Sequence, residues 1–401
     1  MSIQTQQLYY KDPYQKEYIA KVLNTQIDGL FIWLLLDHCI FYPGGGGQYP
    51  DQGFINEQPL LEINKKGNEI WLKIENNSSL NIGDTVKTQL DWPFRYFNMQ
   101  AHTAQHLLSG ILFNQFNIKT VSVYFTKEAF AIEIDVNSLN ENIISELISL
   151  ANRKIRENKS VHVKMISKDK LDDFPIRRFP EGIEHLRTIR IEDVDWTACG
   201  GLHVKQLSEI QVIQHLYTEK IRGRYRLFFT CGLKALEKFN FYTQTFKSLR
   251  TLFTCNDSDI YQKVEQLQSE LKSNLFQLGQ LQSLLLENML KSDLNVKDST
   301  IKVVPLPDEI NFSTQVINKV LNKMEENVIV YSYDTNTKKC LIMSNTGIDI
   351  RKHLMPLLDS GTIKGGGKGG FFQGKCESRE DIDQAIKILH ESFEGENYGQ
   401  S

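Results

Sequence analysis

Two short motifs that lie far apart in the chain constrain its fold most strongly. They are His102-Thr-Ala-Gln-His106 and Cys199-Gly-Gly-Leu-His203. Residues four apart on a helix lie on the same face, so His102 and His106 can present two imidazole nitrogens to one ion. Cys199 and His203 have a similar spacing and would complete a set of three imidazoles and one thiolate. Such a set suits a borderline-soft tetrahedral cation, and zinc is the usual one.

Each motif alone also has a plainer interpretation. A histidine pair on an apolar helix is more often a chance pair than a ligand pair, and a single Cys-x3-His is equally weak evidence. The nine histidines and six cysteines are ordinary usage for 401 residues, and a chain rich in neither residue seldom contains both motifs. We therefore predict a metal site that joins a helix to a distant loop.

Length and composition limit the class of protein. A chain of 401 residues suggests two to four domains, and 41% apolar with 24% charged residues is typical of a soluble globular protein. The N-terminus lacks the basic-then-apolar pattern of a secretory signal, and the longest apolar run, Leu30 to Leu36, is too short to span a bilayer. The other cysteines show no framework spacing, as expected for reduced thiols. We therefore expect a cytoplasmic protein with no membrane partner.

The basic residues gather in three groups although the net charge is −3. The groups are Arg177 to Arg190, Lys220 to Arg226 and Lys364 to Lys375. The simplest interpretation of any one group is a solvated surface. Three groups on a mildly acidic chain still permit phosphate binding, because affinity follows the local field rather than the overall charge.

The N-terminal region, from about residue 8 to residue 92, is predicted to consist mainly of strands. The run Leu30 to Leu36 is typical of a buried strand and leads into Phe41-Tyr-Pro-Gly-Gly-Gly-Gly-Gln48. Consecutive glycines can take positive φ angles and let another backbone approach closely. A flexible hairpin is the alternative, but the flanking Phe41, Tyr42 and Asp51 favour a shaped loop.

The rest of the chain alternates predicted helices and strands. Helices are expected at 98–116, 141–158, 257–290, 312–324, 348–358 and 378–393, and strands within 120–135, 187–194, 208–214, 224–231, 301–304, 328–332 and 340–344. Leucines recur at three- and four-residue steps between Val264 and Leu285, which predicts a coiled-coil-like helix that packs on another helix of the same or a partner chain. The segment Gly365 to Gly370 is expected to be a loop that can cradle phosphate. It is not a P-loop, because no Ser or Thr follows Lys368.

In combination and order, these segments resemble the long form of the AlaX-type alanyl-tRNA editing proteins, which are related to the editing and C-terminal domains of alanyl-tRNA synthetase. The loop 41–48 with Asp51 and Gly53, both metal motifs, and the segments 221–232 and 365–370 carry the match. The resemblance covers nearly the whole chain and implies an α+β multidomain fold. The expected domains are a β-rich, barrel-like glycine-loop domain (1–92), an α+β zinc-binding editing domain (93–245), a helical, coiled-coil-like spacer (246–299) and a C-terminal glycine-rich-loop α/β domain (300–401).

The resemblance implies a zinc-dependent hydrolase that acts in trans on tRNA(Ala) wrongly charged with serine, and also on tRNA(Ala) charged with glycine. The Zn²⁺ ligands would be His102, His106, Cys199 and His203. Expected substrate contacts are Gly45, Gly46, Gly47, Gln48 and Ser122, and expected tRNA contacts are Arg222, Arg224, Lys364 and Lys368. A simple strand serine is the alternative for Ser122, and Gln105 is expected to be structural. A homodimer through the spacer or the C-terminal domain is a further expectation.

Some positions depart from the family pattern. Tyr49 interrupts the usual Gln-Pro pair, and Leu202 stands where threonine is common, so any hydroxyl contact there would be lost. The glycine run at 365–370 is shorter than in the family, which weakens the tRNA contact expected there. Too few residues precede the first glycine loop to hold an ATP-dependent aminoacylation domain, so we expect no tRNA charging. The open alternatives are the editing of another aminoacyl-tRNA, because threonyl-tRNA synthetase editing domains share the His/Cys pattern, and a tRNA-binding protein with a structural zinc.

Overall fold

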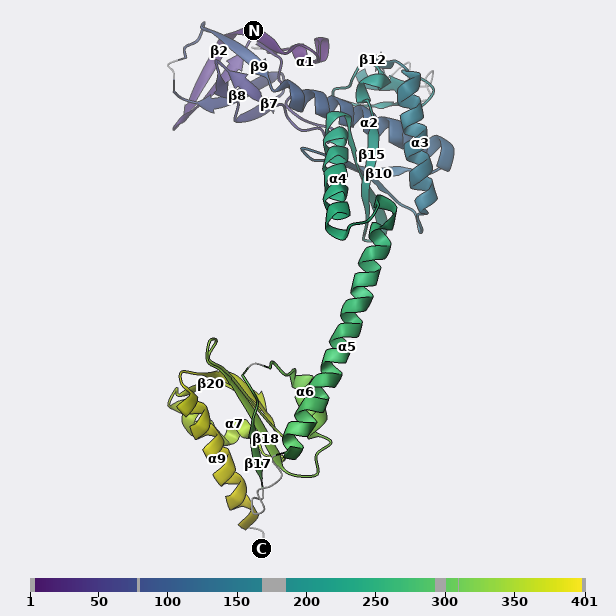
Figure 1. Ribbon diagram of the computed structural model, residues 1–401. Helices are drawn as coiled ribbons and strands as arrows, with labels where there is room; N and C mark the ends of the chain where they lie inside the picture. Colours follow the sequence, from purple (N-terminus) through teal and green to yellow (C-terminus); the bar gives the residue numbers. More distant parts are fainter. Residues whose placement is uncertain (1–3, 78–79, 168–184, 293–300, 309, 399–401) are drawn as a thin grey trace. The chain divides into compact units, whose positions relative to one another are not determined.

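The structure is a computed structural model that describes residues 4–77, 80–167, 185–292, 301–308 and 310–398 (Figure 1). The chain divides into two compact units, residues 1–248 and 249–401. The architecture is mixed α+β and multidomain, as predicted. The finer division at residues 92, 245 and 299 remains a prediction. In the described part of the chain, no helix is both long enough and apolar enough to cross a membrane.

The first unit begins with a curled seven-stranded antiparallel sheet in the order β6-β5-β9-β2-β3-β8-β7. Its alternation is clearest in β8, where Ile70, Leu72 and Ile74 are fully buried and their neighbours face outward. The sheet curls so that β6, near one edge, lies against β8, near the other. The elements of this region are β1 (Gln6–Gln7), α1 (Leu8–Lys11), β2 (Glu17–Asp28), β3 (Phe31–Leu36), β4 (His38–Cys39), β5 (Gly53–Ile55), β6 (Gln58–Pro59), β7 (Glu62–Lys66), β8 (Glu69–Glu75) and β9 (Thr85–Leu90).

A long buried helix, α2 (Trp92–Phe116), carries the first metal motif. It begins at Trp92 rather than at the predicted Asn98, because the Asp91 side chain caps it by accepting a hydrogen bond from Phe94 N. It ends at Asn117, which has the left-handed conformation that commonly terminates helices. Nearly every residue from Phe97 to Leu112 is buried, so the polar residues of this helix face protein rather than solvent.

Two further sheets and one helix pack around α2. A four-stranded sheet has the order β10-β11-β16-β15, and a three-stranded sheet has the order β12-β13-β14. The predicted strand pair within 120–135 and the helix at 141–158 are confirmed. The elements are β10 (Thr120–Phe125), β11 (Phe130–Ile134), α3 (Glu141–Glu157), β12 (Val161–Ser167), β13 (His185–Ile191), β14 (Asp195–Ala198), β15 (Ile213–Ile221) and β16 (Arg224–Cys231).

Two predictions in this region need correction. The segment 208–214 is not one strand: it contains the 3₁₀ helix η2 (Leu207–Ile210), and β15 begins only at Ile213. The side chains of Gln206 and Glu209 form a capping box that favours this turn over an extended strand. The strand predicted at 187–194 ends at Ile191 and turns back into β14, so the second metal motif follows β14.

The helix α4 (Gly232–Phe253), which the sequence pattern did not predict, follows β16. The second unit contains most of the predicted spacer helix, here α5 (Ile260–Ser292), and a sheet in the order β17-β18-β19-β21-β20. The helix predicted at 348–358 is two short helices that meet at Leu354, before Pro356. The elements are η3 (Asp257–Asp259), β17 (Lys302–Pro305), α6 (Thr314–Leu321), β18 (Val328–Asp334), β19 (Lys339–Ser344), α7 (Ile350–His353), α8 (Met355–Asp359), β20 (Ile363–Lys368), β21 (Phe371–Cys376) and α9 (Arg379–Tyr398).

The glycines at 365–370 do not form the predicted loop. Gly365 to Lys368 lie in β20, which pairs with β21 through a tight turn at Gly369 and Gly370. A Cβ added at Gly367 would lie 1.8 Å from the carbonyl oxygen of Phe371. These glycines therefore allow two backbones to approach closely within a hairpin, and the prediction of a loop here is wrong.

The predicted apolar stripe of α5 is exposed along most of its length. The end of the helix, at Leu286 and Leu290, is buried against α6 and the sheet of the second unit. The leucines of the stripe that precede this end are each between 40% and 64% exposed. They are Leu267, Leu271, Leu275, Leu278, Leu281 and Leu285.

Candidate metal centre

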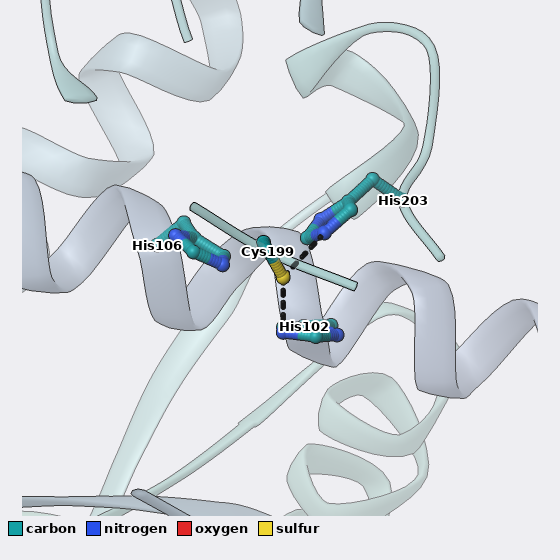
Figure 2. A group of neighbouring side chains, drawn as sticks. All are labelled: His102, His106, Cys199 and His203. Atoms are coloured by element: carbon teal, nitrogen blue, oxygen red, sulfur yellow. Dashed lines mark hydrogen bonds between the residues drawn. The ribbon is translucent and has the colours of Figure 1, made fainter. Parts of the chain in front are cut away.

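Four side chains from the two motifs meet in the first unit (Figure 2). His102 and His106 lie on successive turns of α2, while Cys199 and His203 lie in the segment after β14. Their potential ligand atoms all lie within 4.8 Å of one another. The Cys199 sulfur is 3.3 Å from Nε2 of both His102 and His203. The structure therefore brings the two motifs together as the sequence predicted.

Each of the three imidazole rings has a polar partner at its Nδ1 atom. His102 Nδ1 is 3.0 Å from Gln48 Oε1, and His203 Nδ1 is 3.3 Å from the Thr103 hydroxyl oxygen. His106 Nδ1 is 3.1 Å from a carboxylate oxygen of Asp195, and its Nε2 has no partner in the described part of the chain.

In each ring Nδ1 is thus bound to a partner outside the cluster, which leaves Nε2 for the common centre. Metal-binding histidines are held in this way, with the second nitrogen bound to a carboxylate, a carbonyl or a similar group.

The electrostatics favour the forms of these residues that bind metals. Burial alone would raise the pKa of the Cys199 thiol, but the three histidines lower it well below its usual value. Burial, with the neighbouring His102, lowers the pKa of His203 to about 3, so this ring is neutral. Burial would lower the pKa of His106, but the Cys199 thiolate and Asp195 raise it. A thiolate with inward-facing imidazole nitrogens fits a borderline-soft cation, and binding one would displace the proton on His106.

Side chains from other segments hold the turn that carries Cys199 through hydrogen bonds to its backbone carbonyl oxygens. The Arg187 guanidinium donates to the carbonyl oxygens of Cys199 and Gly201, each at 2.7 Å. It also lies 4.9 Å from the centre of the Tyr10 ring, whose hydroxyl donates to Gly200 O at 2.8 Å. The conformation of the turn is therefore set by contacts with β13 and with α1, far away in the sequence.

Three members of the cluster, His102, His106 and Cys199, line a cavity of about 490 Å³. Hydroxyl and amide groups surround the histidines there. Gln105 Nε2 and Thr120 Oγ1 both donate to the Ser109 hydroxyl, at 2.9 and 2.8 Å. Gln105, for which we expected a structural role, thus also lines the cavity. The lining residues are Gly46, His102, Gln105, His106, Ser109, Thr120, Val121, Ser122, Val123, Thr197, Ala198, Cys199 and Gly200.

The other predicted substrate contacts divide into two groups. Gly46 and Ser122 line the cavity, whereas Gly47 packs near Phe125. Gly45 and Gln48 close the glycine turn through two backbone hydrogen bonds of 3.1 Å, and the Gln48 side chain is buried. All four glycines of the loop have positive φ angles, so the loop is shaped, as predicted.

The predicted tRNA contacts do not line this cavity. Arg222 and Arg224 lie at the turn between β15 and β16, where Arg224 is 3.4 Å from Glu133 and 3.8 Å from Asp135. Lys364 and Lys368 are exposed on β20, in the second unit. The RNA-binding role of these four residues remains a prediction.

Several residues of the centre have no signal in the sequence. Asp195, Thr103 and Arg187 are single residues of common types, and their partners are distant in the chain. The metal motifs were visible because both the residue types and the spacing are diagnostic. Nothing comparable marks the groups that hold them.

The fold and the cluster define a multidomain α+β protein with a candidate metal centre beside a polar cavity. No family model matches the chain. Aarsd1-B of Xenopus laevis, an alanyl-tRNA editing protein, is 30% identical over 90% of this chain and 89% of its own length. The alanyl-tRNA editing protein AlaX-L of Pyrococcus horikoshii is 28% identical over 96% of this chain and 98% of its own length. The chain belongs to the alanyl-tRNA editing protein family.

Two other similarities are more limited. The alanine–tRNA ligase of Pyrococcus abyssi is 26% identical over 96% of this chain, but the match covers only 44% of the ligase. The solved structure of RecJ from Thermus thermophilus covers 37% of this chain with a TM-score of 0.24, which is too low to indicate a shared fold.

Proposed function

We propose that this protein is a trans-editing hydrolase that removes serine, and also glycine, from mischarged tRNA(Ala). The single observation that carries the proposal is the cluster of His102, His106, Cys199 and His203, three of which, all but His203, line a cavity rich in hydroxyl groups. The names of the relatives, which are alanyl-tRNA editing proteins and alanine–tRNA ligases, support tRNA(Ala) as the partner.

The donor set supports zinc as the metal, held by these four residues. Bound zinc is a Lewis acid that can polarise a water or an ester oxygen and orient the 3′ end of a substrate. The protein's own part is to hold the site in place. Gln48, Thr103 and Asp195 orient the three imidazoles, and Arg187 fixes the turn that carries the thiolate.

The cavity supports selection of serine over alanine. The two amino acids differ by one hydroxyl group, and the wall offers hydroxyls at Ser109, Thr120 and Ser122 and an amide at Gln105. A site that hydrogen-bonds a substrate hydroxyl rejects an analogue without it, because its own polar groups are then left unpaired. We assign the contact with the serine hydroxyl to Ser122, and the contact with the aminoacyl backbone to the glycine loop at Gly46.

The remaining surfaces are assigned to tRNA and to a second copy of the chain. Lys364 and Lys368 on β20, with Arg222 and Arg224 on the other unit, supply positive charge for phosphates. The exposed leucine stripe of α5 supports a homodimer through this helix.

One observation favours a second candidate function. All four ligand positions are filled by protein side chains, which is the pattern of structural zinc sites. A tRNA-binding protein with a structural zinc would have this property without being an enzyme.

Deacylation assays separate the two functions. The wild-type protein should deacylate Ser-tRNA(Ala) and leave Ser-tRNA(Ser) charged. The His106→Ala variant should lose this activity, while its circular dichroism spectrum shows a retained fold. Binding of tRNA(Ala) without any deacylation would instead identify the binding protein. Equal hydrolysis of both serine esters would reject tRNA(Ala) as the specific partner.

A further inference from the structure

The glycine loop of the N-terminal sheet reaches the metal centre through one side chain. Gln48 lies at the end of the loop 41–48, and its side chain is buried. Its Oε1 accepts a 2.8 Å hydrogen bond from the backbone N–H of Leu202, inside the second metal motif. The same oxygen is 3.0 Å from Nδ1 of His102, on the first metal motif.

We propose that Gln48 is a positioning residue of the metal centre, which fixes the tautomer and ring orientation of His102 and ties this ring to the turn of Cys199 and His203. The inference rests on the metal site of the proposed function. It reassigns Gln48 from a direct substrate contact to a residue that acts through a ligand.

The contacts of Gln48 determine which atoms of its amide and of the His102 ring donate and which accept hydrogen bonds. A backbone N–H can only donate, so the Gln48 atom that faces Leu202 is the carbonyl oxygen and not the amide nitrogen. That oxygen can only accept, so His102 must carry its proton on Nδ1. In the neutral ring Nε2 is then unprotonated, and this atom faces the Cys199 sulfur at 3.3 Å. One oxygen of Gln48 thereby selects the tautomer that can bind a metal.

The surroundings leave little freedom for a different arrangement. A Cβ added at Gly201 would lie 2.1 Å from His102 Cε1 and 2.9 Å from Gln48 Oε1, so the three groups are in close contact. The loop itself is closed by the two hydrogen bonds between the backbones of Gly45 and Gln48. The positive φ angles of the preceding glycines allow this turn, which directs Gln48 inward.

The two ends of the Gln48 amide differ in a way that a mutation series can use. Its Oε1 has two partners, whereas its Nε2 has none among the residues whose structure is described. Positioning needs only the acceptor, while a substrate contact through this side chain would need the unpaired donor. Gln48→Glu keeps acceptors and loses the donor. In Gln48→Met the side chain has a similar length but neither the carbonyl acceptor nor the amide donor.

The test measures metal affinity by competition with a chelator, with zinc as the probe. Loss of the group that orients a metal-binding histidine typically weakens binding about 10- to 100-fold. We expect that loss for Gln48→Met and an affinity close to wild type for Gln48→Glu. The matched control is Gln52→Met in the same segment, whose exposed side chain predicts no change. The visible spectrum of the Co²⁺ form should change in Gln48→Met alone.

Nuclear magnetic resonance of the wild-type protein keeps the proposal testable if Gln48→Met does not fold. With ¹⁵N-labelled histidine, His102 should be the tautomer protonated on Nδ1, and the opposite tautomer would overturn the proposal. Equal zinc affinity for wild type and a folded Gln48→Met, or an equal loss for Gln48→Glu and Gln48→Met, would also overturn it. If the wild-type protein itself binds no zinc, the proposed metal site fails, which is a separate result.

Discussion

The buried ion pair between Asp51 and Arg95 should set much of the stability of the first unit. Both side chains are fully buried, and Asp51 also accepts a hydrogen bond from Tyr42 N at the start of the glycine loop. Arg95 further donates to the carbonyl oxygens of Pro13 and Ile40. The pair thus joins α2 to the backbone at Pro13 and Ile40 and to the loop that carries Gln48.

The substitution Asp51→Asn leaves the Arg95 guanidinium buried without a countercharge. Breaking one partner of a buried pair costs about 3–5 kcal/mol, which corresponds to a fall in melting temperature of about 6–20 °C for a unit of this size. The measurement is thermal and urea unfolding, followed by circular dichroism.

Asp193→Asn is the matched control, because the Asp193 side chain is 71% exposed and its partner Lys159 is 3.4 Å away. This exposed pair should contribute less than about 1 kcal/mol. The double variant Asp51→Asn, Arg95→Met should lose less stability than the two single losses added together, because it removes the unpaired charge. A loss below about 1 kcal/mol for Asp51→Asn would refute this reasoning.

Three further predictions concern the site and its RNA. Gly201→Ala should weaken zinc binding by at least about 10-fold, whereas Gly200→Ala, whose Cβ would be 3.9 Å from the nearest atom, should not. Equilibrium zinc competition checks both. Ser122→Ala should lower kcat/KM for Ser-tRNA(Ala) roughly 2- to 12-fold and leave the slow rate on Ala-tRNA(Ala) unchanged, and an equal change on both esters would exclude a hydroxyl contact. Alanine substitutions at Lys364 and Lys368 should make the plot of log affinity for tRNA against log salt concentration less steep. The slope should fall in magnitude by about 0.7–0.9 for each phosphate that is no longer neutralised. An unchanged slope would exclude phosphate contacts by these two lysines.

The sequence predicted the metal cluster because its residues carry their chemistry in type and spacing. His102 and His106 need only a helix to lie together, and their spacing of four residues is a local property of the sequence. The partner groups could not be predicted in the same way. Asp195 contacts His106 and Gln48 contacts His102 only because segments distant in the sequence fold against α2, and no local pattern encodes those contacts.

The errors in the predicted fold have similar physical origins. The glycines from Gly365 to Gly367 suggested a loop because glycine is flexible, yet here its small size serves the close pairing of β20 with β21. The sequence predicts a strand at 208–214, but the side chain of Glu209 caps a turn at the start of this segment instead. In both places a contact made after folding decides between two locally acceptable conformations.

The most direct test of the central claim compares single-turnover deacylation of Ser-tRNA(Ala) and Ala-tRNA(Ala) by the same zinc-loaded protein. If a hydroxyl-lined cavity beside the cluster selects the substrate, the serine ester should be cleaved about 100-fold faster or more. Cys199→Ala should abolish this difference by removing the fast reaction, while the slow reaction of the alanine ester stays near its uncatalysed rate. Equal rates on the two esters, or full activity in Cys199→Ala, would contradict the account.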